Sequence, residues 1–273
     1  MYEQYWGLTC SPFPTGIGEG WFYESPTHEE GLARLDFLLE QRRRCGVLTG
    51  EKGTGKSSLL AILSRQLRRS QRQAAVIDAC GFSGDQLLCQ LVDALHLSPI
   101  DTNRPYLQWR SVRDHLHGLA RSRQQTVLMF DHFNHRDTDC TRTIEQLLHL
   151  GDAGDRWHTV IVAVDTSTPA PLTASFFQLA DLRIHLTPFD QRETSYYVYQ
   201  SLTEAGAERE LFEPAALEAV FGLSAGLPRR INQICELSLL AGMFDEQRTI
   251  DAETVISAAE HLPLGEILDR VAE

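Results

Sequence analysis

Apolar runs of strand length alternate with amphipathic helical segments through residue 189 of the chain. Consecutive apolar residues predict five buried strands, at residues 47–48, 74–78, 126–131, 159–165 and 181–189. Apolar residues at helical spacing predict the intervening helices, at residues 25–44, 59–67, 84–97, 105–123 and 140–152, with a short one near Phe176. Buried strands separated by helices are typical of a parallel sheet covered on both faces. The sequence therefore predicts the α/β class.

The strand pattern stops after Pro188, and the rest of the chain is helical in pattern. Four helices are expected, at residues 192–205, 214–223, 228–242 and 251–261, with Gly206, Gly226 and Gly242 at the breaks. Residues 1–24 are rich in Gly, Pro and aromatic side chains and fit neither helix nor strand. Because aromatic rings are costly to leave in water, we expect an ordered arm. The expected organisation is an arm (1–24), an α/β domain (25–189) and a helical domain (190–273).

Charge and cysteine content narrow the function classes. The formal net charge of −12 argues against binding nucleic acid over the whole surface. Arginines nevertheless cluster at 42–44, 65–72 and 121–123, and two interpretations stay open: cations that complement helix ends, or a local DNA-facing patch. The six cysteines form no C-x-x-C pair, and no apolar run is long enough to span a bilayer. We expect reduced thiols, a cytoplasmic location and no membrane insertion.

The segment GEKGTGKS, residues 50–57, fills every fixed position of the pattern G-x-x-x-x-G-K-[ST]. It follows an apolar run and opens a helix, which is the context that this pattern requires. Glycines let consecutive N–H groups turn inward around an anion, and the helix N-terminus points its positive end at the same anion. The sequence therefore predicts a nucleoside triphosphate site, with ATP as the ligand. The expected contacts are Gly50, Glu51, Lys52, Gly53, Thr54, Gly55, Lys56, Ser57 and Ser58.

Three residues are the candidates for chemistry at this site. Lys56 is expected at the β- and γ-phosphates. Asp131 ends an apolar strand and is expected to hold Mg²⁺ together with the Ser57 hydroxyl. His132 follows directly, and a neutral imidazole can act as general base for the attacking water, with Asn134 orienting it; a polar loop residue is the alternative.

Two further groups of residues are less specific. Asp165 and Thr166 end the next strand, where side chains line the ligand crevice of a parallel sheet, but the same pair is ordinary turn chemistry. Arg229 and Arg230 open a helix of the second domain. Because cations are unfavourable at a helix N-terminus, these arginines indicate a nearby anion such as a triphosphate.

The chain resembles the AAA+ ATPases, in the branch typified by the ATPase component A of the general secretion pathway. The resemblance covers nearly the whole chain, from MYEQYWGL and PFP through the phosphate loop to LTPF and GLPRRINQICELSLLAG. It implies a five-stranded parallel sheet sandwiched by helices, with the phosphate-loop strand central, and a C-terminal helical lid. It also implies that residues 50–57 are the Walker A motif, Asp131 the Walker B residue and Arg229 the sensor-2 arginine.

Two positions depart from the family pattern. His132 stands where the family usually has a catalytic Glu. Relatives tend to have a Gln-Arg pair before the fifth strand as an arginine finger, whereas here Gln178 is followed by Leu179, and Arg183 lies inside the strand. The expected function is an ATPase that couples nucleotide state to lid motion and to assembly. Two alternatives stay open: a nucleotide-gated DNA-binding adaptor like the transposition helper ATPases, and a hydrolysis-silent scaffold with an unidentified protein partner. The chain is also a possible homo-oligomer.

Overall fold

The chain divides into two compact units. The structure, a computed structural model, describes residues 1–14, 23, 25–97, 104–134, 137–150, 158–166 and 178–262. The sheet unit comprises Pro26–Lys52 and Lys56–Leu186, and the helical unit comprises Met1–Ser25, Gly53–Gly55 and Thr187–Glu273. We continue to propose residues 1–24, 25–189 and 190–273 as arm, nucleotide-binding domain and lid. The short helix expected near Phe176 lies outside the described residues.

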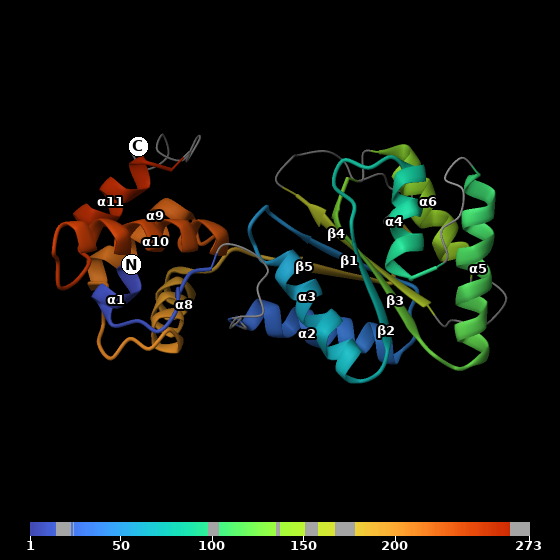
Figure 1. The fold of residues 1–273 in the computed structure, drawn as a ribbon, viewed down its shortest axis with the longest axis horizontal. Coiled ribbons are helices and arrows are strands. Elements are labelled where there is room, and N and C mark those ends of the chain that lie inside the picture. Colours follow the sequence, from blue (N-terminus) through green and yellow to red (C-terminus); the bar gives the residue numbers. More distant parts are fainter. Residues whose placement is uncertain are drawn as a thin grey trace. The chain divides into compact units, whose positions relative to one another are not determined.

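Five parallel strands form the sheet of the first unit (Figure 1). They are β1 (Cys45–Gly50), β2 (Gln73–Asp78), β3 (Thr126–Phe133), β4 (His158–Asp165) and β5 (Leu182–Leu186), in the order β2-β3-β4-β1-β5. The expected five-stranded parallel sheet is therefore confirmed. The phosphate-loop strand β1 was expected at the centre of the sheet, and this prediction is wrong. The middle strand is β4, and β1 lies between β4 and the edge strand β5.

Helices cover both faces of this sheet. Leu32, Leu35 and Leu59 on α2 (Pro26–Glu40) and α3 (Lys56–Arg69) pack with strand residues such as Val127 and Met129. The alternate strand residues, including Leu128 and Phe130, pack with the other three helices. These are α4 (Gly84–Ala94), α5 (Pro105–Arg121) and α6 (Thr138–His149). Because successive side chains of a strand point to opposite faces of the sheet, each strand contributes side chains to two separate cores.

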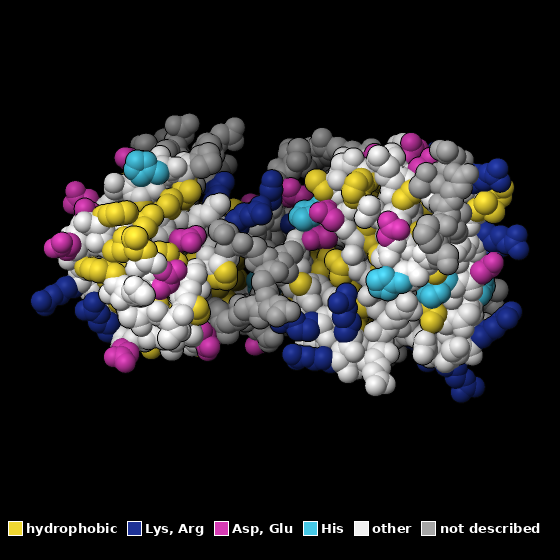
Figure 2. Space-filling view, viewed as in Figure 1, with side chains coloured by type: hydrophobic (Ala, Val, Ile, Leu, Met, Phe, Trp, Pro, Cys, Tyr) yellow, Lys and Arg dark blue, Asp and Glu magenta, His cyan; other side chains and the backbone are white. Residues whose placement is uncertain are grey.

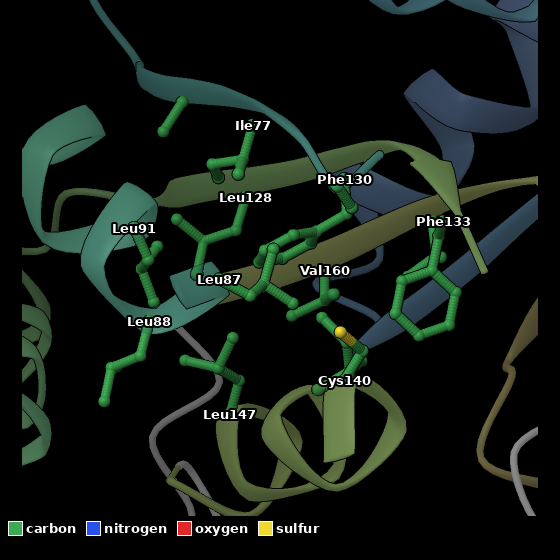
Figure 3. Close-up of a cluster of buried hydrophobic side chains, with 14 of the residues drawn as sticks. Ile77, Leu87, Leu88, Leu91, Leu128, Phe130, Phe133, Cys140, Leu147 and Val160 are labelled. Atoms are coloured by element: carbon green, nitrogen blue, oxygen red, sulfur yellow. The ribbon is translucent and has the colours of Figure 1, made fainter. Parts of the chain in front are cut away.

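Strand β3 contains a β-bulge at its carboxyl end. Phe130 pairs with Val162 and Phe133 with Val164, so β3 has one residue more than β4 across this step. His132 takes up the extra residue with a left-handed φ of 51°. Both phenylalanines consequently lie in one core, between the sheet and helices α4 and α6 (Figure 3). The sequence placed the end of this strand at Asp131, and the structure corrects it to Phe133.

The helical unit has its own core. It contains α1 (Tyr2–Trp6), α8 (Gln191–Glu204), α9 (Pro214–Ser224), α10 (Pro228–Phe244) and α11 (Ala252–Glu260). The N-terminal segment belongs to this core: Trp6 is 4% exposed, and its Nε1 donates a hydrogen bond to the Leu239 carbonyl at 2.8 Å. The expectation of an arm without helix is therefore wrong for residues 2–6. A five-residue helix shows too little periodicity to be recognised, and here tertiary packing stabilises it.

Gly242 was expected to end a helix, but it lies inside α10. A Cβ at this position would collide with Ile250 and approach the Trp6 ring at 3.1 Å. The residue is therefore small because two side chains pack against the helix there. Within the described ranges, every helix is too short or too polar to cross a lipid bilayer.

Candidate nucleotide-binding site

The loop between β1 and α3 is built by two glycines. Gly53 has a φ of 97° and Gly55 a φ of 95°, a backbone region that residues with a Cβ rarely adopt. The chain then enters α3 directly at Lys56. The loop therefore ends in the free N–H groups of a helix N-terminus, which attract an anion.

Lys56 is held inside this loop. Its Nζ donates hydrogen bonds to the Gly50 carbonyl at 2.8 Å and to the Glu51 carbonyl at 2.7 Å, and the residue is only 9% exposed. Burial lowers the pKa of the Lys56 ammonium, while the carboxylates of Asp165 and Asp131 act in the opposite direction. The buried ammonium and the adjacent helix N-terminus both favour the binding of a negatively charged polyphosphate.

Asp131 lies on the sheet face that α3 covers. It continues the alternation of Val127 and Met129, which pack against α2 and α3, and it is 5% exposed. Its Oδ1 accepts a hydrogen bond from the His132 backbone N–H at 2.9 Å. Because both Asp131 and Asp165 interact electrostatically with Lys56, the fold brings the ends of β3 and β4 to the start of α3.

Oxygen ligands are available for a magnesium ion. Ser57 is the second residue of α3, and its hydroxyl and the Asp131 carboxylate are the donor types that Mg²⁺ prefers. Among the described residues, no three or more His, Cys, Asp or Glu side chains are arranged to hold a metal ion by themselves. Sites of this kind commonly use one or two protein oxygens and complete the coordination with substrate phosphates and water.

His132 is paired with a carboxylate that sequence reasoning did not single out. Its Nδ1 lies 3.1 Å from Asp78 Oδ1 and 3.8 Å from Asp131 Oδ2, and its side chain is half exposed. An ionised carboxylate only accepts hydrogen bonds, so of the two neutral tautomers the contact with Asp78 selects the one with its proton on Nδ1. The other ring nitrogen, Nε2, is then left as an acceptor.

Asp78 gave a weak signal in the sequence. It is the last residue of β2, and it is the register partner of Asp131 in the parallel pair of β2 and β3. The sequence places an Asp at the end of the second, third and fourth predicted strands, but it does not say which strands are neighbours. Strand adjacency therefore had to come from the structure.

The remaining predicted residues are placed as follows. In the loop, Glu51 and Lys52 are exposed, Thr54 is fully buried and Ser58 is half-buried. Thr166 N–H donates to the Gly50 carbonyl at 3.1 Å, which ties the end of β4 to the start of the loop. Arg229 is exposed in the first turn of α10, in the helical unit. Arg183 is exposed on β5, as expected.

Comparisons with known proteins agree with this fold. Residues 39–167 match the model of the AAA domain family. Over 246 residues, or 88% of this chain, the sequence is 29% identical to general secretion pathway protein A of Aeromonas hydrophila. The chain spans 45% of the length of that relative.

Solved structures show the same fold at low sequence identity. The ORC2 protein of Aeropyrum pernix, in ADPNP and ADP complexes, is 17% identical with a TM-score of 0.65, covering 90% of this chain and 71% of that one. The A. pernix ORC1 protein in complex with DNA is 13% identical with a TM-score of 0.68, covering 92% and 68%. The Thermotoga maritima RuvB Holliday junction branch migration motor is 16% identical with a TM-score of 0.55, covering 92% and 73%.

Residues 39–167 therefore match the AAA domain family, and the fold resembles that of the AAA+ P-loop ATPases. The similarity to general secretion pathway protein A extends over most of the chain. The resemblance inferred from the sequence is therefore confirmed.

Proposed function

We propose that this chain binds ATP with Mg²⁺ in the loop of residues 50–58 and hydrolyses ATP to ADP and phosphate. The observation that supports this best is the loop itself, with glycines at φ 97° and 95° and the Lys56 ammonium buried within it. Backbone amides of the loop and the first turn of α3 would hold the phosphates. Ser57 and Asp131 would hold the magnesium ion, which supplies charge neutralisation at the phosphate oxygens.

His132 is proposed as the general base in place of the usual Glu. Asp78 holds Nδ1–H, so that Nε2 accepts a proton from water. The water oxygen forms a bond to the γ-phosphorus, and the bond from that phosphorus to the β–γ bridging oxygen breaks, leaving ADP and phosphate. Lys56 stabilises the negative charge on the phosphates. The positioned pair Asp78–His132 is the part of this scheme that this chain adds to the family pattern.

Lid coupling through Arg229 is also part of the proposal. Pro228 opens α10 and Arg229 follows, at a helix end where a cation is unfavourable unless an anion compensates it. The triphosphate is the anion that we propose. Binding would then shift the equilibrium between lid states, as expected when a ligand contacts one state better than the other.

A hydrolysis-silent scaffold that recruits a protein partner is the second candidate. The observation that favours it is the exposure of the His132 side chain, 52%, because a solvated base gains little from a closed site. Both candidates predict that ATP raises the melting temperature. Only the ATPase predicts release of phosphate, and a gain of activity in His132→Glu would support the scaffold.

ATP turnover measured against protein concentration, with and without DNA, tests the proposal. An ATPase releases phosphate with Mg²⁺ present and loses this activity in Lys56→Ala. Specific activity that rises with protein concentration would support a homo-oligomer, and constant specific activity would support a monomer. The described cysteines are all free thiols, which supports the proposed cytoplasmic location.

A further inference from the structure

Three loops at the amino edge of the sheet consist only of Ser, Gln and Arg. They are residues 41–44 between α2 and β1, 70–72 between α3 and β2, and 122–125 between α5 and β3. In Figure 1 the three helices end on the lower side of the sheet unit. We call this surface the arginine edge, and we define it by six exposed arginines: Arg42, Arg43, Arg69, Arg72, Arg121 and Arg123.

Hydrogen bonds, strand pairing and a charge interaction connect the three loops. Gln125 Nε2 donates to the carbonyl of Leu39, in the last turn of α2, at 2.9 Å. Gln73 begins β2 directly beside Thr126, the first residue of β3. Arg72 interacts with Asp36 on α2, where it opposes the rise of the Asp36 pKa that burial and Glu40 cause. The loops therefore form one continuous surface.

The same backbone geometry ends all three helices. Arg42, Gln71 and Arg123 have left-handed φ values of 49°, 58° and 56°. In each case the N–H of this residue and that of the next one bond back to helix carbonyls three and five residues earlier, respectively, as in a Schellman motif. Glycine is the low-energy choice at such a position, and α8 uses Gly206 in the same motif.

Two of the three positions thus have Arg where Gly would fit the backbone better. A cation near the last carbonyls of a helix interacts favourably with the helix dipole, and both of these side chains are also exposed at the edge.

The charge balance of this edge is positive. The described carboxylates near it are Asp36, Glu40 and Asp181, and Arg43 lies 4.0 Å from Asp181. No ion pair is found for Arg69, Arg121 or Arg123 within the described part of the chain. In Figure 2 the lower side of the sheet unit shows Lys and Arg side chains, whereas its Asp and Glu side chains lie higher.

We propose that the arginine edge binds the phosphate backbone of double-stranded DNA without sequence preference. Arg, Ser and Gln are side chains that contact DNA phosphates, and Arg does so bidentately. The loop residues include no apolar side chain for insertion into a bilayer, which favours DNA over an anionic membrane. Because the chain has a net charge of −12, the attraction is confined to this edge.

This surface is independent of the proposed ATP site. The phosphate loop, Asp131 and Asp165 lie at the carboxyl ends of the strands, at the opposite edge of the sheet. DNA bound at the amino edge leaves the nucleotide loop accessible. Failure of one proposal is therefore distinguishable from failure of the other.

The experiment compares two substitutions that relieve the same backbone strain. The double variant Arg42→Gly/Arg123→Gly removes two charges, and Gln71→Gly in the third loop removes none. All three positions have left-handed φ, so neither variant is expected to lower the melting temperature. Binding of a fluorescent 30-base-pair duplex is measured by anisotropy between 50 and 200 mM salt.

The double variant should bind duplex at least tenfold more weakly than wild type at 50 mM salt. Its slope of log affinity against log salt should fall by about 2, about one for each arginine. Gln71→Gly should match wild type, and so should Lys56→Ala. Equal affinity of the double variant and wild type would overturn the proposal. Preferential binding of the wild type to vesicles of anionic lipid over duplex would also overturn it and identify a membrane surface instead.

Discussion

His132 Nδ1 lies 3.1 Å from Asp78 Oδ1, and the two residues come from the ends of neighbouring parallel strands. The bulge that gives His132 its left-handed φ turns Phe133 back into the core, so His132 projects beside Asp78. A carboxylate that fixes one ring nitrogen leaves the other free for proton transfer. In our proposal, His132 is therefore the general base of this site and Asp78 is the residue that positions it.

Substitutions of this pair should separate base and positioning roles. His132→Ala should lower kcat for ATP hydrolysis about 100-fold, the lower end of the range for a general base. Asp78→Asn should lower kcat about tenfold with KM unchanged, because the ring loses its fixed tautomer while ATP contacts stay intact. Asp93→Asn on α4 is the matched control for loss of one surface carboxylate. Full activity of Asp78→Asn would exclude its positioning role.

The two lysines of the chain provide a paired test of ATP binding. ATP at a concentration of 100 Kd should stabilise the wild-type fold by about 2.7 kcal/mol and so raise its melting temperature. Lys56→Ala should abolish this rise in melting temperature. Lys52→Ala should retain the shift, since Lys52 is exposed and contributes its backbone amide to the loop. Differential scanning fluorimetry with and without ATP and Mg²⁺ makes the comparison. An unchanged shift in Lys56→Ala would refute the proposed triphosphate site.

Two helical glycines should respond in opposite directions to alanine. Gly242→Ala should lower the free energy of unfolding by about 1–3 kcal/mol, because the new methyl group collides with Ile250 and Trp6. Gly222→Ala on α9 has nothing within 4 Å and should raise it by about 0.5–1 kcal/mol through helix propensity. Urea denaturation measures both values. Stabilisation by Gly242→Ala would show that the contact of α10 with Trp6 is loose.

Buried His158 should make the sheet unit sensitive to acid. Its Nε2–H donates to the Leu147 carbonyl at 2.9 Å, and burial lowers the pKa of His158 below its ordinary value of 6.5, with Arg44 and His117 adding to this effect. Below pH 6.5 the unfolded chain takes up a proton at His158 while the folded chain does not, so this contribution to stability is lost as pH falls.

The variant His158→Gln keeps an N–H donor and does not titrate. Melting temperatures of wild type and variant, measured from pH 7.5 to 5.5, should converge as pH falls, with wild type more stable at pH 7.5. A constant difference across this range would show that His158 does not contribute to the acid sensitivity.

Much of the sheet unit was predictable from local patterns. Strands buried on both faces and helices with an apolar stripe have periodicities that are visible in a single sequence. The phosphate loop was predictable for a related reason, since its function depends on consecutive backbone positions and on the glycines that allow them. Boundaries were less certain, and the β3 bulge moved one strand end by two residues, from Asp131 to Phe133.

What the sequence by itself determined is therefore the resemblance to the AAA+ ATPases, the sheet-containing and helical parts of the chain, and the loop of residues 50–57. The tertiary structure alone decided which strand ends are neighbours, and so it brought Asp78 to His132 and Asp165 to Lys56. It also decided that α1 packs against α10 and that three arginine-containing loops form one edge. The reason is physical: backbone conformation and periodicity are local properties, whereas strand order and side-chain contacts depend on how distant segments bury their apolar faces together.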